Sequence, residues 1–134
     1  MKHITKLMIN EFKIKKLGYD FMGYSLQKGD MYNYHHLIIP ARLGGERTRE
    51  NGAILCGNTS HSYLHLIEYI DPDIFNYITT EMIDENIKGY LDVENIKRIH
   101  SILYQFEREH GSDRSNKGKL LIRERYYQRQ NFNN

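Results

Sequence analysis

Cysteine is almost absent from this chain of 134 residues, in which Cys56 is the only one. A single thiol cannot form an internal disulfide, and it cannot supply the four cysteines of a structural zinc site. The sequence therefore predicts a protein of a reducing compartment, whose core is held together by packing and not by cross-links.

Long apolar runs are lacking too, and so are internal repeats and low-complexity segments. No stretch approaches the roughly 20 apolar residues that a membrane-spanning helix needs. The basic start, MKHITKLMINEFKIKK, has neither the apolar core nor the cleavage site of a signal peptide. We therefore expect a soluble cytoplasmic protein with no membrane partner.

The chain is long enough for one domain with a substantial core, and its charge is distributed unevenly. Residues 1–20 carry five Lys against two acidic side chains, and residues 112–134 carry six Lys or Arg against two acidic ones. Residues 66–110 carry ten carboxylates against four Lys or Arg. Positive ends around an acidic middle suit contact with a polyanion, but charged tails are equally often just solvated.

The first half of the chain predicts a β-hairpin with a long loop. The segment MYNYHHLII, residues 31–39, is strand-like and ends at Pro40, which cannot donate a hydrogen bond to a sheet. A polar, glycine-containing connection leads to AILC, residues 53–56, which we expect to be the second strand. Residues 4–16 have an apolar spacing that fits a helix and a strand equally well, so their structure stays open.

Three helices are expected after the hairpin. The segment GNTS offers capping side chains for the first of them, over residues 61–70. Asp71 as N-cap predicts a second helix that runs to Gly89, and Asp92 as N-cap predicts a third that stops at Gly111. The apolar stripes of the last two helices indicate that they form a scaffold.

Four of the seven histidines fall within 31 residues, and their spacing suits a metal site. His61 and His65 are four positions apart, so on a helix their side chains share a face at a separation that one metal ion bridges. The alternative is a surface pair, or a partly buried pair satisfied by hydrogen bonds. A third imidazole, His35 from the facing strand, leaves coordination positions open, as a catalytic metal requires.

His36 and Asn51 are the candidates for the remaining chemistry. Neighbouring side chains of a regular strand face opposite sides, so a site that uses both His35 and His36 lies at a strand end or edge. An imidazole takes up a proton near neutral pH, as a general base must, although His36 can equally be a polar residue that faces solvent. Asn51 is most simply a turn residue before Gly52, but its amide can also tie the long loop to the backbone and hold the base in place.

The sequence resembles the ββα-metal motif of the HNH (His-Asn-His) nucleases. The resemblance lies in the order of the pair His35 and His36, then Asn51, then His61 and His65. Asn51 lies fifteen positions after His36, and the glycine pair in the loop and the "LC" before the helix also match. The resemblance covers residues 32–70 and implies an α+β fold with a ββα-metal (His-Me finger) core. It places this core in a single domain over residues 1–134, packed on a helical scaffold at 71–111 and followed by a basic tail at 112–134.

What the resemblance implies is a metal-dependent endonuclease that hydrolyses phosphodiester bonds, with DNA as the expected substrate. His36 would be the general base that activates water, Asn51 would orient it, and His35, His61 and His65 would hold one divalent metal ion against the scissile phosphate. Imidazole ligands suit Zn²⁺, Ni²⁺ or Mn²⁺, and Mg²⁺ fits if water and phosphate fill the open positions. Double-strand cutting by one active site per chain would favour a homodimer.

Arginines in the loop and the tail are the expected phosphate contacts, with an exposed solubilising role as an equal alternative for each. They are Arg42, Arg47, Arg49, Arg123, Arg125 and Arg129.

The chain departs from the family in two respects. Cys56 lacks the partner cysteines that bind a structural zinc in many members, and the step from Cys56 to His61 is one residue longer than in the common CxxCH form.

Two other function classes fit part of this pattern. A non-catalytic nucleic-acid-binding protein would keep the ββα fold and use the metal only for structure, but it would have little need of His36. A metal-free, histidine-rich interaction domain would show neither tight metal binding nor salt-sensitive binding to DNA.

Overall fold

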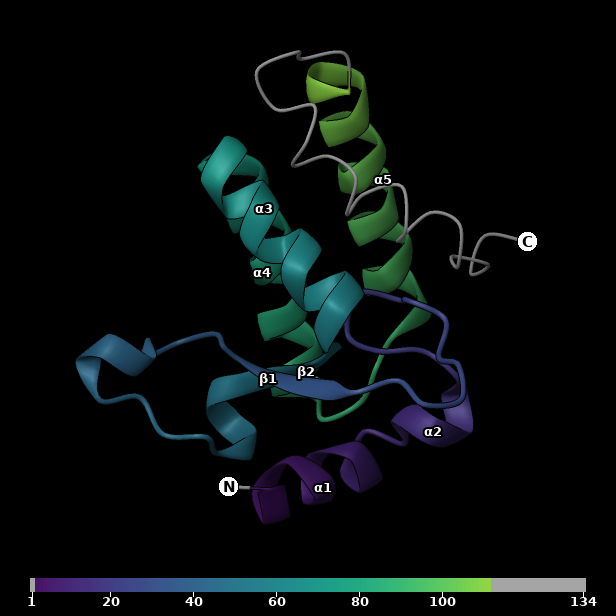
Figure 1. Ribbon diagram of the computed structural model, residues 1–134, viewed down its shortest axis with the longest axis vertical. Coiled ribbons are helices and arrows are strands. Elements are labelled where there is room, and N and C mark those ends of the chain that lie inside the picture. The colour runs from purple at the N-terminus through teal and green to yellow at the C-terminus, as the bar shows by residue number, and fades with distance from the viewer. Residues whose placement is uncertain (1, 112–134) are drawn as a thin grey trace.

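The computed structural model describes residues 2–111, and the side chains from residue 6 onward. Over this range the protein has a mixed α+β architecture, in which a two-stranded sheet carries helices on both faces (Figure 1). The strands are β1 (Tyr32–His36) and β2 (Gly52–Cys56). The helices are α1 (Lys2–Glu11), α2 (Ile14–Leu17), α3 (Ser62–Ile70), α4 (Pro72–Lys88) and α5 (Val93–His110).

The expected hairpin is confirmed, with β1 and β2 antiparallel and Tyr34 opposite Ile54. β1 nevertheless ends at His36, before the predicted end at Pro40. The reason is a side chain, because the Asn51 amide oxygen accepts hydrogen bonds from the N–H groups of residues 38 and 39 and draws the backbone away from the strand path. Gly52 starts β2 because the Tyr34 ring lies where its Cβ would be, only 2.1 Å from that position.

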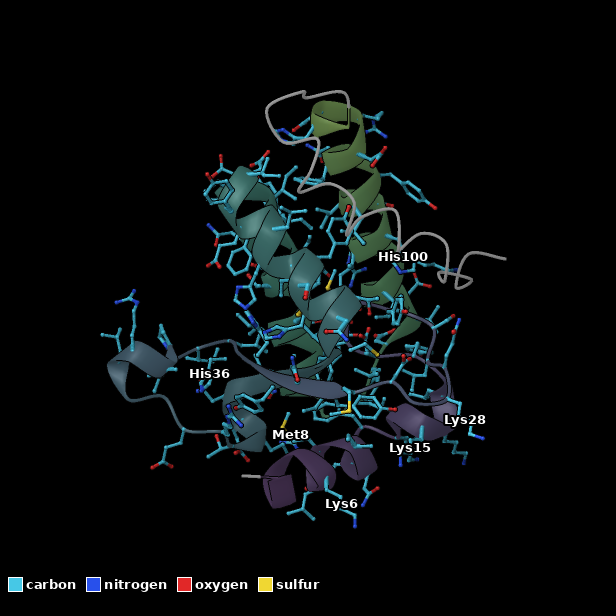
Figure 2. The ribbon with its side chains drawn as sticks, viewed as in Figure 1. Lys6, Met8, Lys15, Lys28, His36 and His100 are labelled. Atoms are coloured by element: carbon cyan, nitrogen blue, oxygen red, sulfur yellow. The ribbon has the colours of Figure 1, made fainter. Side chains whose placement is uncertain are left out.

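Helices that precede and follow the hairpin in the chain cover the two faces of the sheet. α1 packs on one face, where Met8 points toward the sheet and Lys6 points away from it (Figure 2), while α3 and α4 cover the other face. β2 is therefore buried along its whole length. The apolar spacing of segment 4–16 fitted a helix and a strand equally well. The segment is helical, and this conformation packs Met8 and Phe12 in the core.

The scaffold helices α4 and α5 match the prediction. The Asp71 side chain accepts a hydrogen bond from the N–H of Ile74, and Gly89 closes α4 in a left-handed conformation. Asp92 caps α5 in the same way, by accepting from the N–H of Glu94. Their buried stripes are Ile74, Ile78 and Met82 on α4, and Ile96, Ile99, Leu103 and Phe106 on α5. No helix within residues 2–111 has the length and apolar character needed to cross a membrane.

The start of α3 differs from the prediction. Residues Gly57–His61 form a π-helical turn that runs straight into α3, and no side chain caps either segment. The chain enters the turn from β2, where the buried Asp20 carboxylate accepts a hydrogen bond from the N–H of Cys56 at 2.9 Å. His61 consequently sits in the last position of a π turn, a kind of helical irregularity that is frequent at functional sites.

Candidate metal centre

Three imidazoles converge between the sheet and α3, as the spacing predicted. β1 supplies His35, the π-helical turn supplies His61 and α3 supplies His65. One ring nitrogen from each lies within 4.8 Å of those from the other two. The ring centroids of His61 and His65 are 4.6 Å apart, and the His35 centroid is 5.6 and 5.2 Å from them. We call these three residues the histidine cluster.

Hydrogen bonds from outside the histidine cluster orient two of its rings. The Nε2 atoms of His61 and His65 face each other at 3.0 Å, while the Nδ1 atom of His65 lies 3.2 Å from a Glu68 carboxylate oxygen. On the far side, Nδ1 of His61 lies 3.2 Å from the amide nitrogen of Asn33. One consistent chain of donors runs from Asn33 through His61 and His65 to Glu68, with both histidines neutral.

Metal binding at both Nε2 atoms requires a change in this chain of hydrogen bonds. His61 has to carry its proton on Nδ1, and Asn33 then has to present its amide oxygen as acceptor, which a rotation of the amide group by about 180° achieves. Zinc ligands at about 2.0–2.1 Å in a tetrahedron lie about 3.3 Å from each other, close to the observed Nε2 separation of 3.0 Å. The separation of His61 and His65 therefore fits a metal ion after a small adjustment.

Burial keeps two rings of the histidine cluster in the form that binds metals. Burial first, and then the neighbouring imidazoles of His65, His61 and His36, lower the pKa of His35 to about 3. The pKa of His61 falls to about 4, first through burial and then through His65. Both rings are therefore neutral at pH 7, and a neutral imidazole offers a lone pair to a cation.

His36 reaches the same cleft as the histidine cluster, although neighbouring strand residues face opposite sides. It is the last residue of β1 (labelled in Figure 2), and its ring packs edge-on against Tyr34 with centroids 4.9 Å apart. The cleft, of about 760 Å³, is lined by His35, His36, His61, His65, loop residues that include Pro40, Ala41 and Arg42, and α4 residues that include Phe75, Asn76, Thr79 and Thr80. Its size falls in the range of small-ligand sites.

Asn51 is buried and clamps the long loop at its base. Its amide oxygen accepts from the N–H groups of Ile38 and Ile39 at 3.2 and 2.7 Å, and its amide nitrogen donates to the carbonyls of Ile39 and Glu46 at 3.0 and 3.1 Å. Its backbone carbonyl also accepts from the N–H of Leu37. The amide ties the loop to the end of β1, and it acts on His36 through the backbone.

The predicted phosphate contacts separate into three groups. Arg42 and Arg47 line the cleft. Arg49 forms an ion pair with Glu11 at 2.6 Å and lies over the Phe12 ring, and it is absent from the lining of the cleft. The tail residues Arg123, Arg125 and Arg129 fall outside the described range. Of the three predicted contacts that the structure describes, Arg42 and Arg47 are placed where a phosphate at the histidine cluster would meet them.

The sequence reasoning missed three residues that support the site. Glu68 lies three positions after His65, on the same helical face, and Asn33 lies two before His35, on the same strand face, so spacing would have identified both. Asp20 carried no local signal, because its partner Cys56 is 36 positions away. Its carboxylate also accepts from the N–H groups of Met22 and Tyr24.

A second group of possible metal ligands lies between the helices. Asp71, Glu109 and His110 each offer an atom within 4.8 Å of the others. Asp71 already caps α4, and its other oxygen pairs with Nε2 of His110 at 2.9 Å. This arrangement is accounted for by its structural role, which is to fasten the end of α5 to the start of α4.

The resemblance to the HNH nucleases, over residues 32–70, stays a prediction from the sequence. The residues behind this prediction are the histidine pair on β1, the buried Asn51, His61 in the π-helical turn and His65 on α3. No model of a known protein family matches the chain, and no curated protein or solved structure matches it either.

Proposed function

We propose that the protein is a metal-dependent endonuclease, in which β1, β2 and α3 form a ββα-metal motif. One observation carries the proposal: His36 and the histidine cluster line the same cleft. A base and a cation site within one cavity are what in-line hydrolysis of a phosphodiester needs. Arg42 and Arg47 at the cleft add the positive charge that a polyanionic substrate requires.

Each residue has a defined task in the proposed reaction. Water attacks phosphorus opposite the 3′ oxygen, His36 takes the proton from that water, and the bond from phosphorus to the 3′ oxygen breaks as the new bond forms. A divalent metal ion held by the histidine cluster would supply positive charge to the phosphate oxygens and the departing oxygen. Asn51 holds the backbone that carries His36, and Glu68 and Asn33 orient the rings of the metal ligands.

The ligand set favours catalysis over a purely structural metal. A structural zinc site is closed by four protein ligands, whereas the described residues place three imidazoles together, beside a cleft that admits water and a phosphate group. A non-catalytic nucleic-acid-binding protein remains the second candidate function, because Arg42 and Arg47 would serve it equally well.

The test uses metal-stripped protein resupplied with Mg²⁺, Mn²⁺, Ni²⁺ or Zn²⁺ and offered supercoiled plasmid, single-stranded DNA and RNA. We expect metal-dependent cleavage that the His36→Ala variant loses while it still binds the metal. His65→Ala is the matched comparison, because it should lose metal binding and cleavage together. If folded, metal-loaded protein cleaves none of these substrates with any of the metals, the binding function replaces the nuclease.

A further inference from the structure

We propose that the loop at residues 38–43 is a wedge that unstacks a base step of double-stranded nucleic acid bound in the cleft. The proposal rests on the proposed function, since it assumes that the cleft receives a nucleic acid. It goes beyond that function by assigning a substrate form, a deformable duplex, and the residues that meet its bases. Apolar side chains of this kind kink duplexes when they enter between neighbouring base pairs.

The wedge has an apolar surface that nothing in the described chain covers. Ile38, Ile39 and Leu43 are 56, 50 and 64 % exposed, although all three are large aliphatic side chains. The loop that carries them projects from the body of the protein, at the left of Figure 1. Single exposed apolar residues are ordinary, but three on six consecutive positions of a projecting loop indicate a contact surface.

The backbone of the wedge is held in one shape. The carbonyl of Pro40 accepts hydrogen bonds from the N–H groups of Leu43 and Gly45, both at 3.0 Å, and the carbonyl of Ala41 accepts from Gly44. Gly45 packs so closely on the carbonyl of Ile39 that a Cβ would lie 1.9 Å from its oxygen. A loop that is already ordered loses little conformational entropy when it inserts, so its apolar contacts are available for binding.

The foot of the wedge is anchored beside the reaction centre. The Asn51 amide fixes both sides of the loop, at Ile39 and at Glu46, and the Tyr34 hydroxyl donates to the carbonyl of Thr48 at 2.5 Å. Because His36 directly precedes this anchored segment, the distance between the base and the wedge is fixed. A strand whose phosphate lies at the histidine cluster would place neighbouring bases against the loop.

Charge favours a nucleic acid over an apolar protein or a lipid surface. Arg42 sits within the wedge and lines the cleft together with Arg47, so cationic side chains lie next to the apolar ones. Phosphates flank every base step of a duplex, so the cationic side chains would meet phosphates where the apolar side chains meet bases. An apolar protein groove offers no such anions, and the lining of one cleft by these arginines and by the histidine cluster favours a phosphodiester over a lipid surface.

The test uses full-length protein, a duplex with 2-aminopurine at successive positions, and the triple variant Ile38→Ser, Ile39→Ser, Leu43→Ser. Binding of the His36→Ala protein should raise 2-aminopurine fluorescence several-fold at one step, and adding the triple substitution should abolish the rise. Ile87→Ser is the matched control, because Ile87 is 78 % exposed on α4 and is not among the residues that line the cleft. Circular dichroism and thermal melting verify the fold of each variant.

A second readout separates this proposal from the proposed nuclease function. Bis(p-nitrophenyl) phosphate is a phosphodiester without bases, so its hydrolysis does not need the wedge. The ratio of duplex cleavage to hydrolysis of this diester should therefore fall at least tenfold in the triple variant. If the wild-type protein hydrolyses neither the duplex nor the diester with any of the metals, but the fluorescence rise is intact, the nuclease is refuted and the wedge still stands. The wedge would be overturned if the triple substitution changed neither the fluorescence rise nor the ratio of duplex cleavage to diester hydrolysis. It would also be overturned if the triple variant lost binding to phosphatidylcholine vesicles while its duplex binding stayed the same.

Discussion

Glu68 is the residue whose contact is simplest to test. It accepts a hydrogen bond from His65 and is exposed, so its removal changes the orientation of a metal ligand and little else. Loss of such a partner typically weakens metal binding about 10- to 100-fold. We expect this of Glu68→Ala in a titration against a competing chelator. Glu94→Gln, an exposed carboxylate on α5, should leave the affinity unchanged, and equal affinities for both variants would contradict the role of Glu68.

The pair of Asp71 and His110 makes stability depend on pH in the acid range. Burial raises the pKa of Asp71, but the hydrogen bond from His110 and that from the N–H of Ile74 together lower it below the ordinary 3.8. A carboxyl group with a lowered pKa stabilises the fold above its unfolded pKa, and this contribution is lost as the pH falls through the folded value. We expect Asp71→Ala to lower the unfolding free energy by about 1 kcal/mol at pH 7.

Urea unfolding of the wild type and of Asp71→Ala across pH 2–7 measures this difference. The gap between the two curves should be constant well above pH 3.8 and should shrink as the pH falls through the lowered pKa of Asp71, because the unfolded chain takes up a proton near pH 3.8, before the folded protein does. A gap that stays the same at the acid end would show that the cap and the ion pair do not depend on the charge of Asp71.

At the scale of elements, the loop between the strands depends on one buried amide. Asn51→Ala removes four hydrogen bonds to the loop backbone and should destabilise the protein by about 3 kcal/mol. Because no histidine of the cluster contacts this amide, metal affinity should persist while cleavage falls. Paired measurements of metal binding and of plasmid cleavage check this. A matching loss of both would place Asn51 in the metal site itself.

The π-helical turn that carries His61 depends on Asp20. Asp20→Asn places a second donor against the N–H of Cys56 and should cost about 2 kcal/mol of unfolding free energy. Denaturant unfolding measures the loss, and Asp73→Asn, at an exposed carboxylate, is the control with a change near zero. If both variants unfold alike, the turn is held by packing alone.

Sequence reasoning succeeded for the elements whose signals are local. The caps at Asp71 and Asp92 and the apolar stripes behind them were sufficient for α4 and α5. It failed at the end of β1, which is set by the distant side chain of Asn51. It also failed at the entry to α3, where a π-helical turn without a side-chain cap replaces the expected cap. In the site, the histidine spacing predicted the cluster, but local spacing could not place Arg49 against Glu11.

At the scale of the whole molecule, the histidine cluster would link metal binding to folding. It joins β1 to α3, so a metal ion that binds only the folded chain stabilises it. At a free metal concentration 100-fold above the dissociation constant, the unfolding free energy should rise by about 2.7 kcal/mol. Thermal melting with and without chelator measures this. His65→Ala should abolish the rise, and His110→Ala should keep it unless the second ligand group binds the ion.

The sandwiching of the sheet also has a consequence for the order of synthesis. β2 is buried on both faces, and α4, which covers one of them, follows it along the chain. A nascent chain that has emerged only as far as His65 has all the proposed catalytic residues but exposes the apolar strand on which they depend. We therefore expect the site to become rigid only after α4 has been synthesised, so that, under the proposed function, cleavage of nucleic acid would begin late in translation.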